Sequence, residues 1–415
     1  MGGFSRSSPP SSVSSCANPC IDAKARDQVL RQRARETVPR TLARRQTGSM
    51  CDNAARQVPA VAARLERYEE ALPYARAARD MNERGDQRRP GDRDKPLNQH
   101  CITRLPSDAA GLNRALGIDP RSRDAITERD LRNDRIGHRA ALYRDDTSGQ
   151  IILVARDTQP NTLVDWKTNI DNGQGRDTAQ YQAMRTLSGK LVTNDVNFNV
   201  AGYSKGGGLA QEAGLVSPRS QVFVFNSAGL HEASLARTGT SDFASLTSRT
   251  RAFSAEGDFL TYMNNTTSPA QQVTNARFLR NQIAGGAGSP FRSGYAPSAG
   301  IIGPMQLDHL SPADLAKDSA AYQRARGALL GDLDDMIARR AVGFPPVRAA
   351  SQETIPNSMS AAGRLFGAGN GNPNLGKLAQ HQMSNVVGTA GRPGSMENQM
   401  AADRAFLTRF QNQCG

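Results

Sequence analysis

The chain has 415 residues, a formal net charge of +13 and an isoelectric point near 10. This length can bury a large hydrophobic core, which excludes a small module held together by disulfides alone. No stretch approaches the roughly 20 consecutive apolar residues that a membrane-spanning helix needs, and the longest relevant run covers only residues 151–155. The positive charge is compatible with an anionic membrane surface. A nucleic-acid partner is not expected, because no recognised binding motif accompanies the charge.

The cysteines are odd in number and irregular in spacing: Cys16, Cys20, Cys51, Cys101 and Cys414. Only the first two lie close together, so no zinc-binding pattern follows, and neither a metal nor another cofactor is expected. Disulfides remain open if the protein reaches an oxidising compartment.

The N-terminal third of the chain is predicted to be partly disordered and partly helical. Residues 1–18 are polar and rich in Ser and Pro, and this composition predicts disorder. The segment also lacks the apolar centre of a secretory signal peptide. Residues 19–135 are expected to form a basic helical region and a linker, with an amphipathic helix over residues 54–82. The charges in this region alternate in sign, which favours solvated helix faces over a nucleic-acid arm.

Short β-rich runs alternate with helical patterns from residue 136 onward. A hairpin is expected around the turn at residues 146–149. Further strands are expected at residues 196–201, 221–226 and 250–255, and a helix at residues 179–191. This alternation predicts an α/β fold, a mainly parallel sheet with helices on both faces. We place this α/β domain at residues 136–320 and a helical C-terminal extension at residues 321–415.

A G-Y-S-K-G motif follows the β-rich run 196–201 and precedes a helical pattern. A G-x-S-x-G motif between a strand and a helix is typical of a nucleophile elbow, which makes Ser204 the expected nucleophile. Gly202 and Gly206 leave room for the sharp turn. The backbone amide of Lys205 is an expected oxyanion donor, whereas its side chain can point to solvent. The alternative is an ordinary glycine-rich turn.

A serine hydroxyl needs a general base to take its proton. The chain order of this fold is serine, then acid, then histidine, and His309 suits the loop after the last strand because it directly precedes a helix start at Ser311. The alternative for His309 is a structural histidine. His231 and His381 are the remaining candidates for the base.

The acid and the second oxyanion donor are expected at the ends of strands. Asp258 follows the strand at residues 250–255, where a carboxylate can reach the histidine, with Glu256 as its near competitor. The alternative role for Asp258 is to cap a helix. Thr158 ends an earlier β-rich run and could offer both its amide and its hydroxyl to an oxyanion.

Residues 139–310 resemble the class 3 lipase group and related lipase-like members of the α/β-hydrolase superfamily. The resemblance rests on I-I-L-V-A-R-D-T followed by V-D-W-K-T-N-I, on the elbow G-Y-S-K-G-G-G-L-A, and on F-S-A-E-G-D-F-L at the acid. Asp157 stands where the family has glycine, and Tyr203 stands where it has histidine.

The resemblance implies hydrolysis of carboxylic esters in lipids, with Ser204, Asp258 and His309 as the triad and Thr158 and Lys205 as oxyanion donors. Its implied substrate is a phospholipid or other lipid ester, reached at a peripheral membrane surface. The plan is similar to bacterial phospholipase effectors, made in the cytoplasm, exported without a Sec signal and accompanied by a cognate inhibitor or secretion partner. The alternatives are a soluble esterase or thioesterase, and a catalytically silent interaction protein.

Overall fold

The computed structural model describes residues 19–43, 50–84, 101–158, 163–239, 243–265, 268–284, 320–339, 347–356, 386–387 and 394–415. The described residues form two compact units. One comprises the residues up to Ala62 together with Phe406–Gly415, and the other comprises Ala63–Ala405. The domain boundaries expected after residues 18, 135 and 320 remain predictions, and the segment 1–18 lies outside the described residues.

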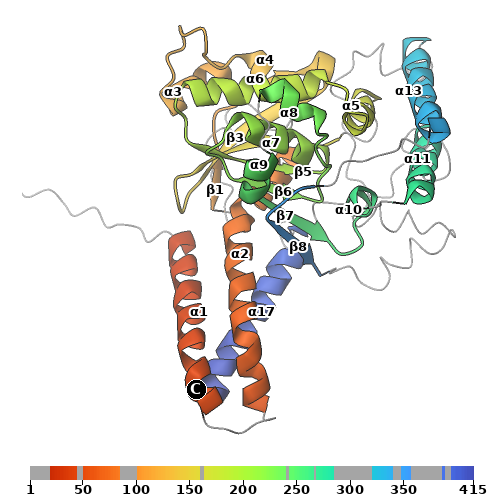
Figure 1. Cartoon of the computed structure of the whole chain (residues 1–415). Helices are drawn as coiled ribbons and strands as arrows, with labels where there is room; N and C mark the ends of the chain where they lie inside the picture. Colours follow the sequence, from red (N-terminus) through yellow and green to blue (C-terminus); the bar gives the residue numbers. More distant parts are fainter. Residues whose placement is uncertain are drawn as a thin grey trace, which may run out of the picture. The chain divides into compact units, whose positions relative to one another are not determined.

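The larger unit is built around an eight-stranded mixed sheet (Figure 1). Its strands are, in spatial order, β1 (Ile102–Arg104), β3 (His138–Asp145), β4 (Ile151–Ala155), β5 (Phe198–Tyr203), β6 (Val222–Phe225), β7 (Thr250–Ala255) and β8 (Ser351–Ile355), with β2 (Arg132–Asn133) paired to β3 alone. Strand β3 is antiparallel to β1 and β4, and all pairs from β4 to β8 are parallel. The expected mainly parallel α/β sheet is confirmed.

Strand β8 was not expected from the sequence. Its residues, S-Q-E-T-I, are mostly polar, and only Ile355 is fully buried. Among the described residues it pairs only with β7, and a short polar strand at a sheet edge has little of the apolar pattern that marks a buried strand. The parallel series therefore continues more than 90 residues beyond the end of β7.

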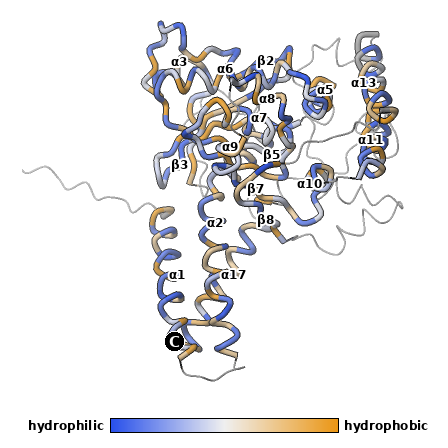
Figure 2. The backbone as a smooth tube through the Cα atoms, in the orientation of Figure 1, coloured by the Kyte–Doolittle hydropathy of each residue, from blue (hydrophilic) through white to orange (hydrophobic). Residues whose placement is uncertain are grey.

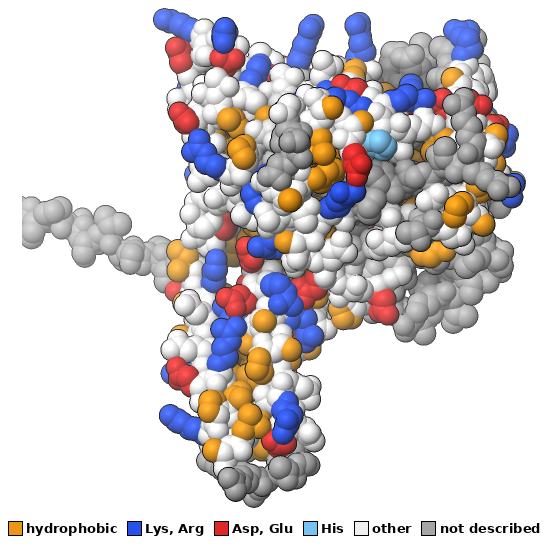
Figure 3. Space-filling view, in the orientation of Figure 1, with side chains coloured by type: hydrophobic (Ala, Val, Ile, Leu, Met, Phe, Trp, Pro, Cys, Tyr) orange, Lys and Arg blue, Asp and Glu red, His pale blue; other side chains and the backbone are white. Residues whose placement is uncertain are grey.

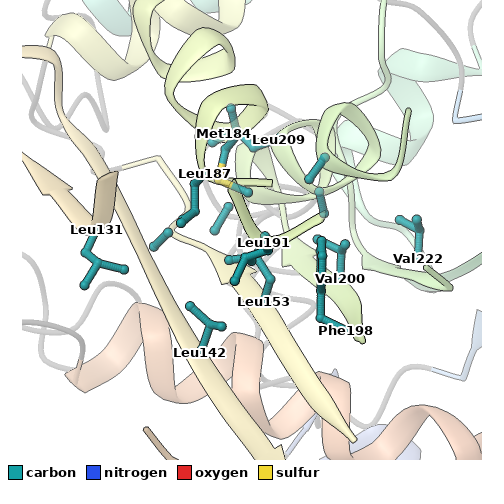
Figure 4. Close-up of a cluster of buried hydrophobic side chains, with 14 of the residues drawn as sticks. Leu131, Leu142, Leu153, Met184, Leu187, Leu191, Phe198, Val200, Leu209 and Val222 are labelled. Atoms are coloured by element: carbon teal, nitrogen blue, oxygen red, sulfur yellow. The ribbon is translucent and has the colours of Figure 1, made fainter. Parts of the chain in front are cut away.

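One face of the sheet carries an aliphatic core under two helices, α6 (Ala179–Thr193) and α7 (Lys205–Val216). Alternate strand residues such as Leu142, Val200 and Val222 point into this core because side chains alternate between the two faces of a strand. Figure 4 shows these residues meeting Met184, Leu187 and other side chains of the helices.

The opposite face is aromatic and is covered by flanking segments of the chain. Helix α2 (Met50–Arg84) stacks Tyr74 on Phe223 with ring centroids 3.7 Å apart and sets Tyr68 edge-on to Phe253. The hydroxyl of Tyr143, on β3, donates to Asp80 of the same helix at 2.9 Å.

Arginines of α2 form ion pairs with acids from distant parts of the chain. These pairs are Arg64–Asp403, Arg67–Glu353 and Arg76–Glu397, in which the second and third partners belong to β8 and to α17 (Ser395–Cys414) and the first to α17. The expectation of solvated helix faces holds in part: the Arg64 and Arg67 side chains remain 34% and 40% exposed, while acids of β8 and α17 form ion pairs with them.

The other helices that the structure describes in the larger unit are α3 (Ala109–Leu116), α4 (Glu128–Leu131), η1 (Asp134–Ile136), α5 (Leu163–Gly173), α8 (Ala233–Thr238), α9 (Phe243–Arg249), α10 (Phe259–Asn264), α11 (Pro269–Ile283) and α13 (Ala320–Arg339). Helices α11 and α13 pack against each other, and α13 also contacts α5, around a second hydrophobic cluster. Among the described helices, none is both long enough and apolar enough to cross a membrane.

The smaller unit consists of α1 (Pro19–Ala43), the first part of α2 and the end of α17. Hydrophobic residues recur along these helices among hydrophilic ones (Figure 2), and many of the buried side chains are small, including Ala34 and Ala55. A disulfide joins Cys51 to Cys414, and the hydroxyl of Thr41 donates to the carbonyl of Cys414 at 3.1 Å. The disulfide therefore ties α2 to the end of α17.

Candidate active site

Ser204 lies in a sharp turn between the last residue of β5 and the first residue of α7. Its backbone has φ 54° and ψ −126°, a conformation that costs free energy for any residue with a side chain. Hydrogen bonds to the end of β6 and the loop after it hold the turn. The Ser204 amide donates to the Phe225 carbonyl at 3.1 Å, and the Ser204 carbonyl accepts from the Ala228 amide at 2.8 Å. This geometry corresponds to the strained strand-to-helix elbow of a nucleophilic serine.

The elbow has no room for larger side chains at its glycines. A Cβ on Gly202 would lie 2.0 Å from the Gly206 carbonyl oxygen, and one on Gly206 would lie 2.5 Å from the Ala155 carbonyl oxygen. Both obstacles are backbone atoms, which cannot move aside without opening the turn. Gly206 therefore allows the start of α7 to lie directly against the end of β4.

Asp258 lies just beyond β7, at the same carboxyl edge of the parallel strands as Ser204. Its carboxylate is 2% exposed, and it accepts a hydrogen bond from the Thr261 amide at 2.6 Å as the N-cap of α10. Glu256 is exposed. Burial at the carboxyl edge favours Asp258 over Glu256 as the acid, and the same carboxylate also performs the capping role.

The two C-terminal histidines, His309 and His381, lie outside the described residues. The premise that His309 follows the last strand is wrong, because β8 begins 42 residues after it. In chain order His309 falls within the β7–β8 connection, and His381 follows β8. The strand order therefore no longer favours His309, and both histidines stay open as the base.

His231 is poorly suited to be the base. Its Nδ1 accepts a hydrogen bond from the Ala233 amide at 3.1 Å, so the proton of the neutral ring sits on Nε2 and no basic nitrogen remains for a serine. Its ring also packs directly on Gly175. Burial lowers its pKa, and the charge of Arg237 lowers it further.

His138 is a buried histidine with a structural role. It is 1% exposed, and its Nε2 donates to the Asp130 carbonyl at 2.9 Å. Burial lowers the pKa of this imidazole to about 4, and the nearby positive charges of Lys205 and Arg156 act in the same direction. His138 is therefore neutral at physiological pH.

The amide of Thr158, an expected oxyanion donor, is already engaged. It donates to the carboxylate of Asp157, the residue that replaces the family's glycine. The Thr158 hydroxyl oxygen accepts from the Asn169 side-chain amide at 3.0 Å, which leaves the hydroxyl proton to be donated elsewhere. In this arrangement the hydroxyl of Thr158 is better placed to donate than its amide.

The side chain of Lys205 does not point to solvent, contrary to expectation. Lys205 is 1% exposed, and its ammonium forms an ion pair with Asp165 of α5 at 2.5 Å. Burial lowers the pKa of Lys205, and the charge of Asp165 opposes that shift. Sequence reasoning missed Asp165 because nothing in the spacing indicates that two residues 40 positions apart meet.

Side-chain amides hold the loop after β6 beside the elbow. The Asn226 backbone has φ 42°, and its buried side-chain oxygen accepts from the Ala255 amide at 2.8 Å. The side-chain amide of Asn264 donates to the Ser227 carbonyl at 2.7 Å. That of Asn172 donates to the Gly229 carbonyl at 2.9 Å. These residues give no motif in the sequence, because their roles depend on contacts between elements.

Within the part of the chain that the structure describes, no group of three or more His, Cys, Asp or Glu side chains is arranged to hold a metal ion.

The sheet order and the serine elbow together define the class of this domain as α/β-hydrolase-like. Residues 110–299 match the family described as Phospholipase-like, Tle-like phospholipase domain. The matched segment includes the predicted site residues from Thr158 to Asp258 and ends before His309. The resemblance to lipase-like hydrolases and phospholipase effectors is thereby confirmed. The match supports a lipid ester hydrolase whose substrate class is lipid. No curated protein matches the chain significantly.

Proposed function

We propose that this protein is a serine phospholipase or lipase that cleaves carboxylic esters of lipids through an acyl-enzyme. The observation that carries the proposal is the left-handed backbone of Ser204 at a glycine-lined elbow, within the segment that matches a phospholipase family. Asp258 is the proposed acid and His309 the proposed base. The backbone amide of Lys205 and the hydroxyl of Thr158 are the proposed oxyanion donors.

The proposed reaction has two halves. The Ser204 Oγ attacks the ester carbonyl carbon while the histidine takes its proton, and the oxyanion accepts hydrogen bonds from Lys205 and Thr158. Collapse of this intermediate breaks the ester bond, and the histidine returns the proton to the departing alcohol oxygen. A water molecule, deprotonated by the same histidine, then releases the fatty acid and restores the serine. Asp258 stabilises the imidazolium in both halves.

Covalent labelling by a fluorophosphonate tests the nucleophile. Wild-type protein should be labelled at Ser204, and Ser204→Ala should abolish both labelling and lipid hydrolysis. Undiminished labelling of the alanine variant would refute the assignment.

His309→Ala and His381→Ala, measured side by side, identify the base. Loss of a triad member typically costs several orders of magnitude in turnover. We expect that loss for His309→Ala and a small effect for His381→Ala. The reverse result would move the base to the segment after β8, and wild-type turnover in both variants would exclude a histidine from either position.

The proposed substrate is a phospholipid presented at an anionic surface. The net charge of +13 should draw the protein to such a surface, although Lys and Arg are interspersed with Asp and Glu on the face shown in Figure 3. Hydrolysis should be faster on vesicles containing phosphatidylglycerol than on neutral vesicles, and salt should reduce the difference. Equal rates on both, with faster cleavage of short soluble esters, would favour an esterase or thioesterase.

We further propose that the protein is a bacterial effector exported from the cytoplasm. Two observations support this: the match to the Tle-like phospholipase family and the disulfide between Cys51 and Cys414, a bond that persists in oxidising compartments and is rare in the cytosol. Thiol labelling of protein recovered from inside and outside the producing cell tests the proposal, since Cys51 and Cys414 should react inside and be protected outside.

A further inference from the structure

The buried ion pair between Lys205 and Asp165 connects α7, whose first backbone amide is one proposed oxyanion donor, to α5, the helix that follows the segment bearing the other. Lys205 is the first residue of α7, directly after Ser204, and its backbone amide is one donor. Asp165 lies in the first turn of α5, which follows the segment that carries Thr158. The side-chain contact between Nζ and Oδ1, at 2.5 Å, therefore bridges the elbow helix and the helix after the Thr158 segment.

Both partners are almost completely removed from water. Each side chain is 1% exposed, and the side-chain amide of Gln180 donates to the same Asp165 oxygen at 2.7 Å while also donating to the Ile136 carbonyl at 2.8 Å. The pair is thus anchored to α6 and to the segment before β3. Removing one partner would leave a buried charge uncompensated.

A buried ion pair is not an efficient way to stabilise a fold. The free-energy cost of removing the two charges from water offsets most of their mutual attraction. Well-packed neutral residues at the same positions often stabilise a fold equally or more. What such a pair does supply is a directional contact of defined length between two elements. Beside a nucleophile, where small displacements of donors reduce turnover strongly, that property has a direct use.

Neighbouring contacts extend this connection to Thr158 itself. Asn169, one helical turn after Asp165 on α5, donates to the Thr158 hydroxyl oxygen at 3.0 Å. On the other side, Gly206 lies against the Ala155 carbonyl at the end of β4. The ion pair thus closes a ring of contacts that runs from the elbow through α5 to Thr158 and back along β4.

We propose that Lys205 and Asp165 are positioning residues that set the separation of the two oxyanion donors. This proposal rests on the proposed function, because it concerns donors to an oxyanion formed at Ser204. The pair acts through the backbone of Lys205 and through α5, and neither side chain takes part in bond making or breaking.

The test is the double variant Lys205→Met/Asp165→Asn, which removes both charges and retains an acceptor for Gln180. We expect kcat to fall on the order of 10- to 100-fold with KM changing little, measured at a temperature where the variant is folded, because the buried Arg156 also loses the attraction of Asp165. The single variant Asp165→Glu, which keeps the carboxylate opposite Lys205, should retain more of the wild-type kcat than the double variant does. The matched control is Lys190→Met/Asp130→Asn, which removes another partly buried Lys–Asp pair, 2.6 Å apart between α6 and α4. This control should lose stability and keep its kcat at a temperature where it is folded.

A wild-type kcat in the double variant would overturn the proposal, as would an increase in KM at unchanged kcat. Should the double variant fail to fold, Asp165→Glu, which keeps both charges and changes only the length of the contact, carries the expectation of a reduced kcat at unchanged KM. Ser204→Ala, measured alongside, distinguishes a failure of the proposed function from a failure of the positioning role. If wild-type protein is no more active than Ser204→Ala, the proposed function fails; if wild-type activity depends on Ser204 but not on the ion pair, only the positioning role fails.

Discussion

The two faces of the sheet are covered in different ways. The face under α6 and α7 is aliphatic, and its helices come from the segment that matches the phospholipase family. The opposite face is aromatic, and the rings packed on it come from α2, which lies outside that match and is joined to α17 by the Arg64–Asp403 ion pair. The family-matched segment therefore supplies the elbow and one half of the core, and the flanking segments of the chain complete the other half.

The helical flanks are therefore not simply additions to a complete hydrolase domain. Without the part of α2 that follows Ala62, the rings of Phe223 and Phe253 would lose Tyr74 and Tyr68. We therefore expect changes on the elbow face to affect turnover, and changes on the flank face to affect stability with little effect on turnover.

The largest effect is expected for Gly202→Ala on the elbow face. The added Cβ would meet the Gly206 carbonyl oxygen at 2.0 Å, so the turn must open and displace Ser204. Turnover and fluorophosphonate labelling should fall by roughly 100-fold or more, with a lower melting temperature. The control is Gly189→Ala in α6, where the new Cβ meets only Val216 at 3.9 Å. Unchanged labelling in Gly202→Ala would refute this account of the elbow.

A second, pH-dependent effect is expected from His138. Its folded pKa of about 4 lies below the ordinary value of 6.5 because of burial, so the unfolded chain binds more protons between these two pH values. The stability contribution is therefore complete above pH 6.5 and is lost as the pH falls toward 4, by about 3 kcal/mol in total.

Urea unfolding of wild type and His138→Gln at several pH values measures this effect. Glutamine can keep a donor for the Asp130 carbonyl and does not titrate, so the stability difference between the two proteins should shrink as the pH falls from 6.5 to 4. Other titrating groups cancel in that difference. A difference that does not change with pH would contradict the assignment.

A smaller and local effect is expected in the helical unit. Replacing Cys51 and Cys414 together by Ser removes the disulfide, and native disulfides typically contribute about 2–4 kcal/mol. Hydrogen exchange of amides in α1 and the first part of α2 should accelerate, whereas exchange in β4 and β5 and the labelling rate of Ser204 should stay as in wild type. Faster exchange in those strands would show that the two units are not independent.

The smallest effects are expected for two tyrosines on the flank face. The Tyr68 hydroxyl is buried and has no hydrogen-bond partner among the described residues, whereas the Tyr74 hydroxyl accepts from Asn199 at 2.8 Å. Tyr68→Phe should therefore keep or raise the stability, and Tyr74→Phe should lower it by about 1 kcal/mol. Thermal melts of the two variants and the wild type measure these stability changes, and kcat should be unchanged in both variants. Equal destabilisation by the two changes would contradict this view of the flank face.

Features that depend on neighbouring residues in the chain could be predicted from the sequence. The strand that feeds Ser204, the glycines around it and the helix that follows are neighbours in the chain, and hydrophobic periodicity revealed the central strands because each is buried on both faces. The place of Asp258 near the carboxyl end of β7 could be predicted for the same reason, since it comes three residues after such a strand.

Tertiary structure alone decided the rest, because it depends on pairs of residues far apart in sequence. Strand β8 carries no apolar pattern and exists through its pairing with β7, and its place in the sheet changed the rationale for His309. The arginines of α2 gained acidic partners from β8 and α17. Lys205 became buried because Asp165, 40 residues earlier, compensates its charge. A charged residue is expected to be exposed to water unless a partner of opposite charge is known, and that partner becomes visible only in the folded structure.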